Sequence, residues 1–190
     1  MQLRQFEMRD DSKAVWLTDP ELTQLIDRVD KDIQRFALGL MGRSGLRVGE
    51  VIQVRADDLV ETEAGKMCRI WQGKGDKYRE TPVTEETYWL GKAKSRGEQS
   101  IIPHTRRSLQ RWVEDAAGEM FLEKEDIGWT YVSAHDLRRS WATMLIQAEV
   151  EPLLVMTFGG WSSYETFRDH YMSVHDPGFQ LQERRKVPWL

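Results

Sequence analysis

Apolar residues recur at helical spacing through most of the chain, and only one central stretch breaks that pattern. The first helix is predicted over residues 18–29, because Thr18 can cap it, Glu21 completes a capping box, and apolar side chains follow every three or four positions. The same criteria predict further helices at residues 31–41, from about 46, and at 85–94, 105–119, 135–149, 152–158 and 163–172.

The central stretch reads as β-structure. Short runs at residues 59–60, 67–72 and 78–83 resemble strands, and glycine-containing turns at 63–66 and 73–76 separate them. The sequence therefore predicts a mainly α-helical fold with a small three-stranded antiparallel β-sheet inserted after the third helix.

The two ends of the chain give weaker patterns. Residues 1–17 are expected to form an N-terminal extension, to which the pattern assigns no element. Residues 18–173 form the main domain. The tail at 174–190 contains Pro177, Gly178 and Pro188, and we expect it to be loose or to dock elsewhere.

Composition narrows the class of protein. Charged residues make up 31% and hydrophobic residues 40% of the 190 residues, which is typical of a soluble globular protein. The longest run without a charge, 152–164, is shorter than the ~18 residues that a membrane span needs. Residues 1–11 carry five charges and no apolar core, so we expect no signal peptide. The single cysteine, Cys68, excludes an intrachain disulfide and a thiolate zinc cluster.

The charge is unevenly distributed. The net charge is −4, which by itself argues weakly against a polyanionic partner. Residues 92–112 nevertheless carry six basic residues and one acid, whereas residues 114–128 carry six acids and one lysine. This segregation predicts either one basic and one acidic face or two ordinary solvated helix surfaces.

Two pairs of residues at i,i+3 spacing could carry chemistry. Ser133 and Asp136 form a capping box, and His135 and Arg138 then share one side of the new helix near its N-terminus, a position that favours an anion. An ordinary capped surface helix is the alternative interpretation. Arg47 and Glu50 repeat the spacing after a glycine turn, where a local ion pair of little energetic weight explains them equally well.

Two further features stand out. Lys74 lies between two glycines at the tip of the predicted hairpin, where it could swing onto a ligand or simply be solvated. Tyr164, Phe167 and Tyr171 recur at helical spacing, which is typical of a core stripe, although a tyrosine hydroxyl can also act as a nucleophile when its surroundings help.

Taken in order, these residues resemble the catalytic domain of the tyrosine recombinases, the phage-integrase and Xer-like site-specific recombinases. The family pattern consists of a Gly-Leu-Arg motif with a following acid, a hairpin lysine, a His-x-x-Arg motif, a Gly-(His/Trp) motif and a C-terminal tyrosine. The matching positions are Gly45-Leu46-Arg47 with Glu50, Lys74, His135 to Arg138, Gly160-Trp161 and Tyr171. Tyr171 follows Trp161 by ten residues where about nine is usual, which we attribute to one extra residue in the last helix or loop.

The resemblance implies a tyrosine recombinase catalytic-domain fold over residues 18–173, without the N-terminal core-binding domain. It implies a DNA breaking and rejoining enzyme that forms a 3′-phosphotyrosine without metal or ATP, and therefore no cofactor. Tyr171 would be the nucleophile. Its supporting residues would be Arg47, Lys74, His135, Arg138 and Trp161, with Glu50 orienting them.

The implied partner is double-stranded DNA. Lys77, Arg106, Arg107 and Arg111 would bind it, although Lys77 also competes with Lys74 for the role of hairpin lysine. Self-association as a tetramer on DNA, with the tail docked on a neighbouring protomer, and a cytoplasmic, nucleoid-associated location follow from the same resemblance. The alternatives are an inactive or regulatory DNA-binding remnant of a mobile element, and a type IB topoisomerase-like enzyme that relaxes DNA.

Overall fold

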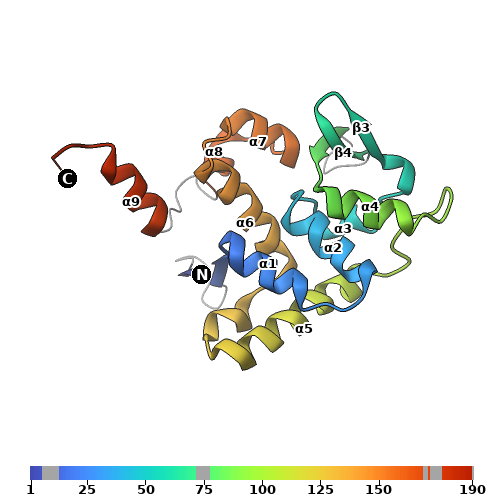
Figure 1. Ribbon diagram of the computed structural model, residues 1–190, viewed down its shortest axis with the longest axis horizontal. Helices are drawn as coiled ribbons and strands as arrows, with labels where there is room; N and C mark the ends of the chain where they lie inside the picture. Colours follow the sequence, from blue (N-terminus) through green and yellow to red (C-terminus); the bar gives the residue numbers. More distant parts are fainter. Residues whose placement is uncertain (6–12, 72–77, 169–170, 172–176, 190) are drawn as a thin grey trace.

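The computed structural model describes residues 1–5, 13–71, 78–168, 171 and 177–189. Within these ranges the predicted fold class is confirmed: helices predominate and a three-stranded antiparallel sheet lies at one end of the helical body (Figure 1). The helices of the body are α1 (Asp19–Asp27), α2 (Asp32–Gly42), α5 (Arg106–Lys124) and α6 (Ala134–Gln147). The shorter helices are α3 (Val48–Val51), α4 (Glu85–Ala93), α7 (Pro152–Gly159), α8 (Tyr164–Phe167) and α9 (Pro177–Arg185), with 3₁₀ turns at Ala56–Asp58 and Ile127–Tyr131.

The sheet is a meander of β3 (Leu59–Thr62), β4 (Gly65–Ile70) and β5 (Arg79–Pro82), paired antiparallel in that order. Leu59 lies opposite Cys68, and Ile70 lies opposite Arg79. One face packs on α4, where Gly91 allows a close approach because a Cβ there would lie 2.3 Å from Leu59 Cδ1. The sheet therefore places Arg79 at a fixed position next to the turn that leads to α3.

Two hydrophobic clusters hold the body together. The larger joins the apolar faces of α1, α2 and α5 with the start of α6, and Phe36, Leu40 and Leu109 in it are fully buried. The smaller joins the rest of α6 to α7 and α8 around Trp141 and Phe167. Since α6 contributes to both clusters, its N-terminal turn is fixed from two sides.

The N-terminal residues, to which the sequence pattern assigned no element, contain two strands. They form a hairpin of β1 (Gln2–Gln5) and β2 (Lys13–Trp16), and β2 lies against α6. The main-chain N–H of Val15 donates to Asp136 Oδ1 over 3.1 Å, and that of Leu17 donates to Ser140 Oγ over 2.8 Å. Val15 and Leu17 are buried, so this strand belongs to the core. The apolar run at residues 14–17 is too short for its periodicity to show this.

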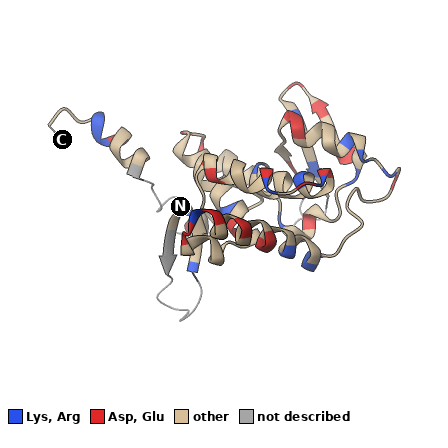
Figure 2. Cartoon of the chain, turned by 60° about the horizontal axis from the view of Figure 1, so that its bottom comes forward, with Lys and Arg blue, Asp and Glu red and all other residues tan. Residues whose placement is uncertain are grey.

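The C-terminal elements also differ in detail from the sequence prediction. Of the helix predicted at residues 163–172, the structure describes α8, which ends at Phe167, and Arg168 and Tyr171, both of which have π-helical backbone. The tail forms α9, which projects from the body in Figures 1 and 2 and is joined to it by an ion pair between Lys186 and Glu149. Among the described residues, no helix combines the length and apolar character that crossing a bilayer demands.

Candidate active site

The turn between α2 and α3 positions Arg47 and Glu50. Gly45 has a φ of +68°, and a Cβ there would lie 2.2 Å from the Trp141 ring, so the turn requires glycine. Arg47 then caps α3. The Glu50 carboxylate accepts hydrogen bonds from the Arg47 main-chain N–H over 2.7 Å and from Arg47 Nη1 over 2.8 Å. The i,i+3 pair of the sequence is thus formed, and it sets the direction of the Arg47 guanidinium.

A second arginine, which sequence reasoning missed, contacts the same carboxylate. Arg79 Nη1 and Nη2 donate to the two oxygens of Glu50 over 2.9 and 2.7 Å, and both side chains are about 5–6% exposed. Burial raises the pKa of Glu50, but the bonds from Arg79 and Arg47 outweigh it and hold that pKa below its usual 4.5. Glu50 is therefore a buried carboxylate shared by two guanidinium groups.

The N-terminus of α6 places His135 and Arg138 together. The N–H and Oγ–H of Ser133 both donate to Asp136 Oδ2, over 2.9 and 2.6 Å, which completes the predicted capping box. Because Asp136 also accepts the N–H of Val15, strand β2 fixes the rotation of this first turn.

Arg138 is buried, with 2% exposure, and its charge is satisfied by main-chain oxygens. Nη2 donates to the carbonyl of Gly159 over 2.6 Å, and Nη1 donates to the carbonyl of Gly45. The guanidinium also lies over the ring of Trp161, with Cζ 4.1 Å from the centroid. Burial, followed by the charge of Arg47, lowers the pKa of Arg138 to about 9, so the side chain stays protonated at neutral pH.

Tyr171 lies in an aromatic cluster beside Arg138. Its ring centroid is 4.7 Å from that of Trp161 and 5.2 Å from that of Phe167, and Trp161 stacks on Trp141 at 6.1 Å. Tyr171 is 5% exposed, whereas Tyr164 is 46% exposed and lies outside the cluster. Of the three residues in the predicted aromatic stripe, Phe167 and Tyr171 are core residues and Tyr164 is not.

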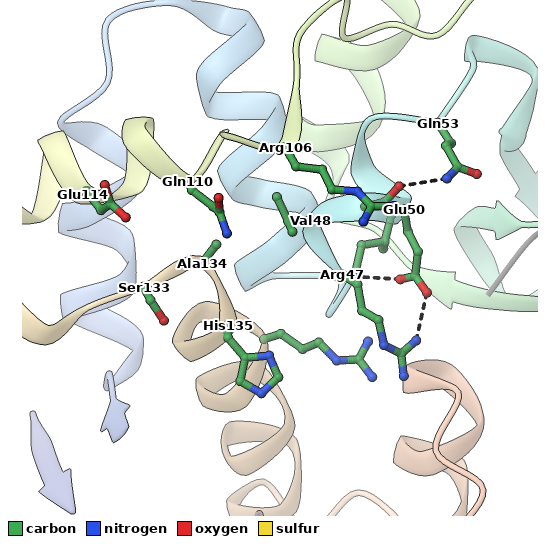
Figure 3. A pocket seen from close by; sticks show the side chains of 13 residues that line it. Arg47, Val48, Glu50, Gln53, Arg106, Gln110, Glu114, Ser133, Ala134 and His135 are labelled. Carbon is green, nitrogen blue, oxygen red and sulfur yellow. Dashed lines mark hydrogen bonds and ion pairs between the residues drawn. The ribbon is translucent and has the colours of Figure 1, made fainter. Parts of the chain in front are cut away.

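An open cavity of about 610 Å³ lies where α3, α5 and α6 meet. In Figure 3, Arg47 and Arg106 extend from one wall, and His135 and Ser133 lie on the facing wall. The other polar residues of the lining are Glu50, Gln53, Gln110, Glu114 and Arg138. Three cationic side chains, two carboxylates and one imidazole thus surround a space large enough for a phosphate group.

His135 is neutral at physiological pH. It is exposed on the cavity wall, yet desolvation by the surrounding wall, the charge of Arg139 and the charges of Arg138 and Arg47 lower its pKa to about 4. A neutral imidazole can donate one hydrogen bond and accept another.

The predicted DNA-binding residues fall into two groups. Arg106 lines the cavity, and its guanidinium lies over Gly49, where a Cβ would be 2.8 Å from Arg106 Cζ. Arg107 and Arg111 are exposed in the first turns of α5 and do not line the cavity. In the cartoon of Figure 2, this end of α5 is coloured for basic residues and the helix farther along is coloured for acidic ones.

The structure thus brings together Arg47, Glu50, His135 and Arg138, with Trp161 and Tyr171 adjoining Arg138. Tyr171 and Trp161 do not line the cavity itself. The two hairpin lysines, Lys74 and Lys77, lie outside the described residues. Within the described ranges, no group of three or more His, Cys, Asp or Glu side chains could hold a metal ion.

Comparisons with solved structures show which known folds this chain resembles. The fold is similar to that of the XerA recombinase, with a TM-score of 0.75 and 19% identity over 92% of this chain and 65% of that one. It is also similar to the XerH site-specific recombinase bound to difH substrate (TM-score 0.68, 22% identity, 96% of this chain and 56% of that one). A third match is the Tn1549 transposon integrase in complex with circular intermediate DNA (TM-score 0.67, 16% identity, 93% and 67%).

The chain therefore spans only 65% and 56% of the XerA and XerH chains that it resembles. No curated protein matches it in sequence. The model of the phage integrase family, however, matches residues 15–177, a range that contains every residue predicted for the catalytic site. The chain belongs to the phage integrase family, whose structural relatives here are tyrosine recombinases.

Proposed function

We propose that this chain is the catalytic domain of a site-specific recombinase that cleaves and rejoins double-stranded DNA through a 3′-phosphotyrosine intermediate. The observation that carries the proposal is the convergence of Arg47, His135 and Arg138 on one cavity, with Tyr171 one aromatic ring away from Arg138. The solved XerH and Tn1549 integrase structures hold DNA, which supports DNA as the partner.

The chemistry rests on two guanidinium groups. In phosphoryl transfer, negative charge develops on the non-bridging oxygens, and a planar guanidinium can donate two parallel hydrogen bonds to them. Arg47 is held by Glu50, and Arg138 is held by carbonyls and Trp161, so both donors are oriented before substrate arrives. Such preorganisation is worth most where the site excludes water.

Tyr171 supplies the nucleophile in this proposal. Its Oη forms a bond to the phosphorus while the bond from phosphorus to the 5′ oxygen breaks, and the phenolic proton leaves. The 5′ hydroxyl of a partner strand later reverses the step, so the bond energy is conserved without ATP. Since Tyr171 is 5% exposed and does not line the cavity, its side chain has to move toward the cavity when DNA binds.

The remaining side chains handle protons and hydrogen bonds. Lys74 would give a proton to the departing 5′ oxygen. His135, neutral at pH 7, and the indole N–H of Trp161 would add hydrogen bonds to the transferring phosphate, and Trp161 can only donate. Glu50 would act by orienting Arg47. No step assigned here requires a metal ion.

A trapping experiment tests the proposal. The substrate is a duplex prepared from DNA fragments that the chain retains and nicked just 3′ of the scissile phosphate. Cleavage releases the short piece that carries the new 5′ hydroxyl, and the protein stays covalently attached to the remaining DNA through the 3′ phosphate. The unmodified chain should form this adduct, and Tyr171→Phe should not. Tyr164→Phe is the matched control, because it removes an exposed hydroxyl from α8 and should keep the adduct. An adduct that persists in Tyr171→Phe would refute the assignment, and DNA retention without any adduct would indicate a binding module alone.

We also propose that residues 174–190 dock on a neighbouring protomer in a DNA-bound tetramer. In support, α9 projects from the body, and Leu181 and Trp189 expose 49% and 85% of their surface (Figure 1). Light scattering on site DNA should show four copies for the full chain and fewer after deletion of residues 177–190. The same stoichiometry for both would contradict this role.

A further inference from the structure

Arg79 has every nitrogen of its side chain engaged, yet it does not line the cavity. Nη1 and Nη2 donate to Glu50 over 2.9 and 2.7 Å, and Nε donates to the carbonyl of Phe158 over 2.8 Å. The side chain is 5% exposed. Arg79 thus joins three elements: β5, on which it lies, α3 through Glu50, and the end of α7 through Phe158.

The carboxylate that Arg79 binds is the one that orients Arg47. Glu50 Oε1 accepts from both Arg47 Nη1 and Arg79 Nη1, and Oε2 accepts from the Arg47 main chain and Arg79 Nη2. The formal charges then sum to +1 for Arg47, Glu50 and Arg79 together, but to zero for Arg47 and Glu50 alone. Arg79 therefore leaves Arg47 with a net positive charge to offer a phosphate.

The end of α7 contacts all three arginines. Arg79 Nε, Arg138 Nη2 and Arg47 Nη2 donate to three consecutive carbonyls, over 2.8, 2.6 and 3.4 Å. These carbonyls belong to Phe158, Gly159 and Gly160. They lie at the C-terminus of the helix, where the backbone dipole is negative, so they attract cations. Arg79, which does not line the cavity, binds one end of this row, and Arg138 and Arg47, which do line it, bind the next two carbonyls.

We propose that Arg79 is a positioning residue for DNA cleavage by Tyr171, and this inference rests on the function proposed above. Through Glu50 and the end of α7 it fixes the guanidinium of Arg47, and it cancels the negative charge of Glu50 that would otherwise repel the DNA phosphate. Arg79 itself touches no substrate.

A neutral DNA analogue separates this role from a merely structural one. In a methylphosphonate, a methyl group replaces one charged oxygen of the scissile phosphate, so less negative charge has to be neutralised. A variant that misplaces positive charge should lose less activity on this analogue than on the phosphate. A variant that is simply misfolded should lose the same fraction on both.

The experiment measures the rate of adduct formation on phosphate and methylphosphonate duplexes at saturating DNA. Arg79→Gln should lose about 10²-fold on the phosphate, as when a preorganised donor is removed, and about tenfold or less on the methylphosphonate. Arg79→Lys keeps the charge and should recover part of the phosphate rate. The control is Arg35→Gln, because Arg35 also donates to a main-chain carbonyl, that of Val29, but lies outside the cavity; it should match the unmodified chain on both substrates.

A double variant shows whether a loss of activity comes from unfolding. Glu50→Gln combined with Arg79→Gln leaves no unpaired buried charge, and circular dichroism should show it folded. Because both residues act through Arg47, the double variant should be no slower than the slower single variant. Equal losses on the two substrates, or losses that multiply in the double variant, overturn the role of Arg79 alone. Absence of any adduct with the unmodified chain overturns the proposed function, and this inference with it.

Discussion

The guanidinium of Arg138 lies against the indole face of Trp161, 4.1 Å from the ring centroid. The same indole contacts Tyr171 at 4.7 Å and stacks on Trp141. A single side chain therefore connects the buried cation with the proposed nucleophile, and a cation over an aromatic face is stabilised most where water is excluded.

Replacing Trp161 should show whether its ring or its N–H matters more. Trp161→Ala removes the cover of Arg138 and should lower the free energy of unfolding by about 3 kcal/mol. Trp161→Phe keeps an aromatic face and should cost only about 1 kcal/mol, but it removes the indole N–H and should slow adduct formation by about 10²-fold. Urea denaturation and trapping measure both. If Trp161→Phe kept the adduct rate of the unmodified chain, the indole would act through its ring alone and not as a donor to the phosphate.

Gly45 allows a second prediction about the turn before Arg47. Gly45→Ala places a Cβ against Trp141 in a backbone with φ of +68° and should lower the free energy of unfolding by about 3 kcal/mol or more. The control is Gly65→Ala, which has a φ of +100° but open space around it, and should cost only about 1 kcal/mol. Similar losses in both variants would show that contact with Trp141 does not constrain the turn.

The sequence indicated the site well where local spacing determines geometry. The pair of Arg47 and Glu50 and the capping box before His135 are contacts within one helical turn, and the structure forms both. The central strands were also found, because their turns contain glycine and their residues do not follow a helical period.

The sequence did not predict the contacts that depend on residues far apart in the chain. The residues next to Arg79 in β5 are polar, so the sequence of this strand is typical of a solvent-exposed one. Arg79 is buried because the fold brings the Glu50 carboxylate against it. Nor does a periodicity argument foresee that the carbonyls of Phe158, Gly159 and Gly160 accept bonds from arginines more than 20 residues away. Strand β2 was missed for the same reason, since its main partner is α6, over 120 residues later.

The low pKa of His135 predicts a pH dependence of stability. Its pKa is about 4 in the folded chain and about 6.5 when unfolded, so both states are neutral above pH 6.5. As the pH falls from 6.5 toward 4, the unfolded chain takes up a proton that the folded chain does not, and stability declines. His135→Gln should remove that part of the decline. We expect the melting temperature of the unmodified chain to fall more than that of the variant between pH 7 and pH 5.

Glu50 contributes little in that pH range, because its pKa is held below 4.5 in the folded chain and is about 4.3 in the unfolded chain. An NMR titration of the His135 ring provides an independent reading, with a midpoint near 4 expected in the free chain. A midpoint near 6.5 would show that the cavity neither desolvates the imidazole nor exposes it to the arginine charges.

The basic end of α5 predicts a salt-dependent affinity for DNA. Arg106→Gln, Arg107→Gln and Arg111→Gln should each weaken binding across all sequences and reduce the slope of log K against log salt by about 0.9. The control is Arg28→Gln, which removes a basic residue paired with Glu123 near the acidic end of α5 and should change neither quantity. Fluorescence anisotropy at several salt concentrations measures both. A slope that stays constant in all four variants would place the DNA on another face.

A bridging-sulfur substrate can decide which hairpin lysine protonates the leaving group. When sulfur replaces the 5′ oxygen at the scissile phosphate, the departing thiolate is stable without a proton, because a thiol has a pKa near 8.5 and an alcohol a far higher one. Lys74→Ala should therefore lose about 10²–10⁴-fold in adduct rate on ordinary DNA and regain most of it on the sulfur substrate. Lys77→Ala, which serves as the matched control three residues away, should show a smaller loss that sulfur does not relieve, as expected for a residue that only binds phosphate. Rescue of Lys77→Ala in place of Lys74→Ala would transfer the role of general acid to Lys77, and rescue of neither would remove the hairpin lysines from the proton transfer.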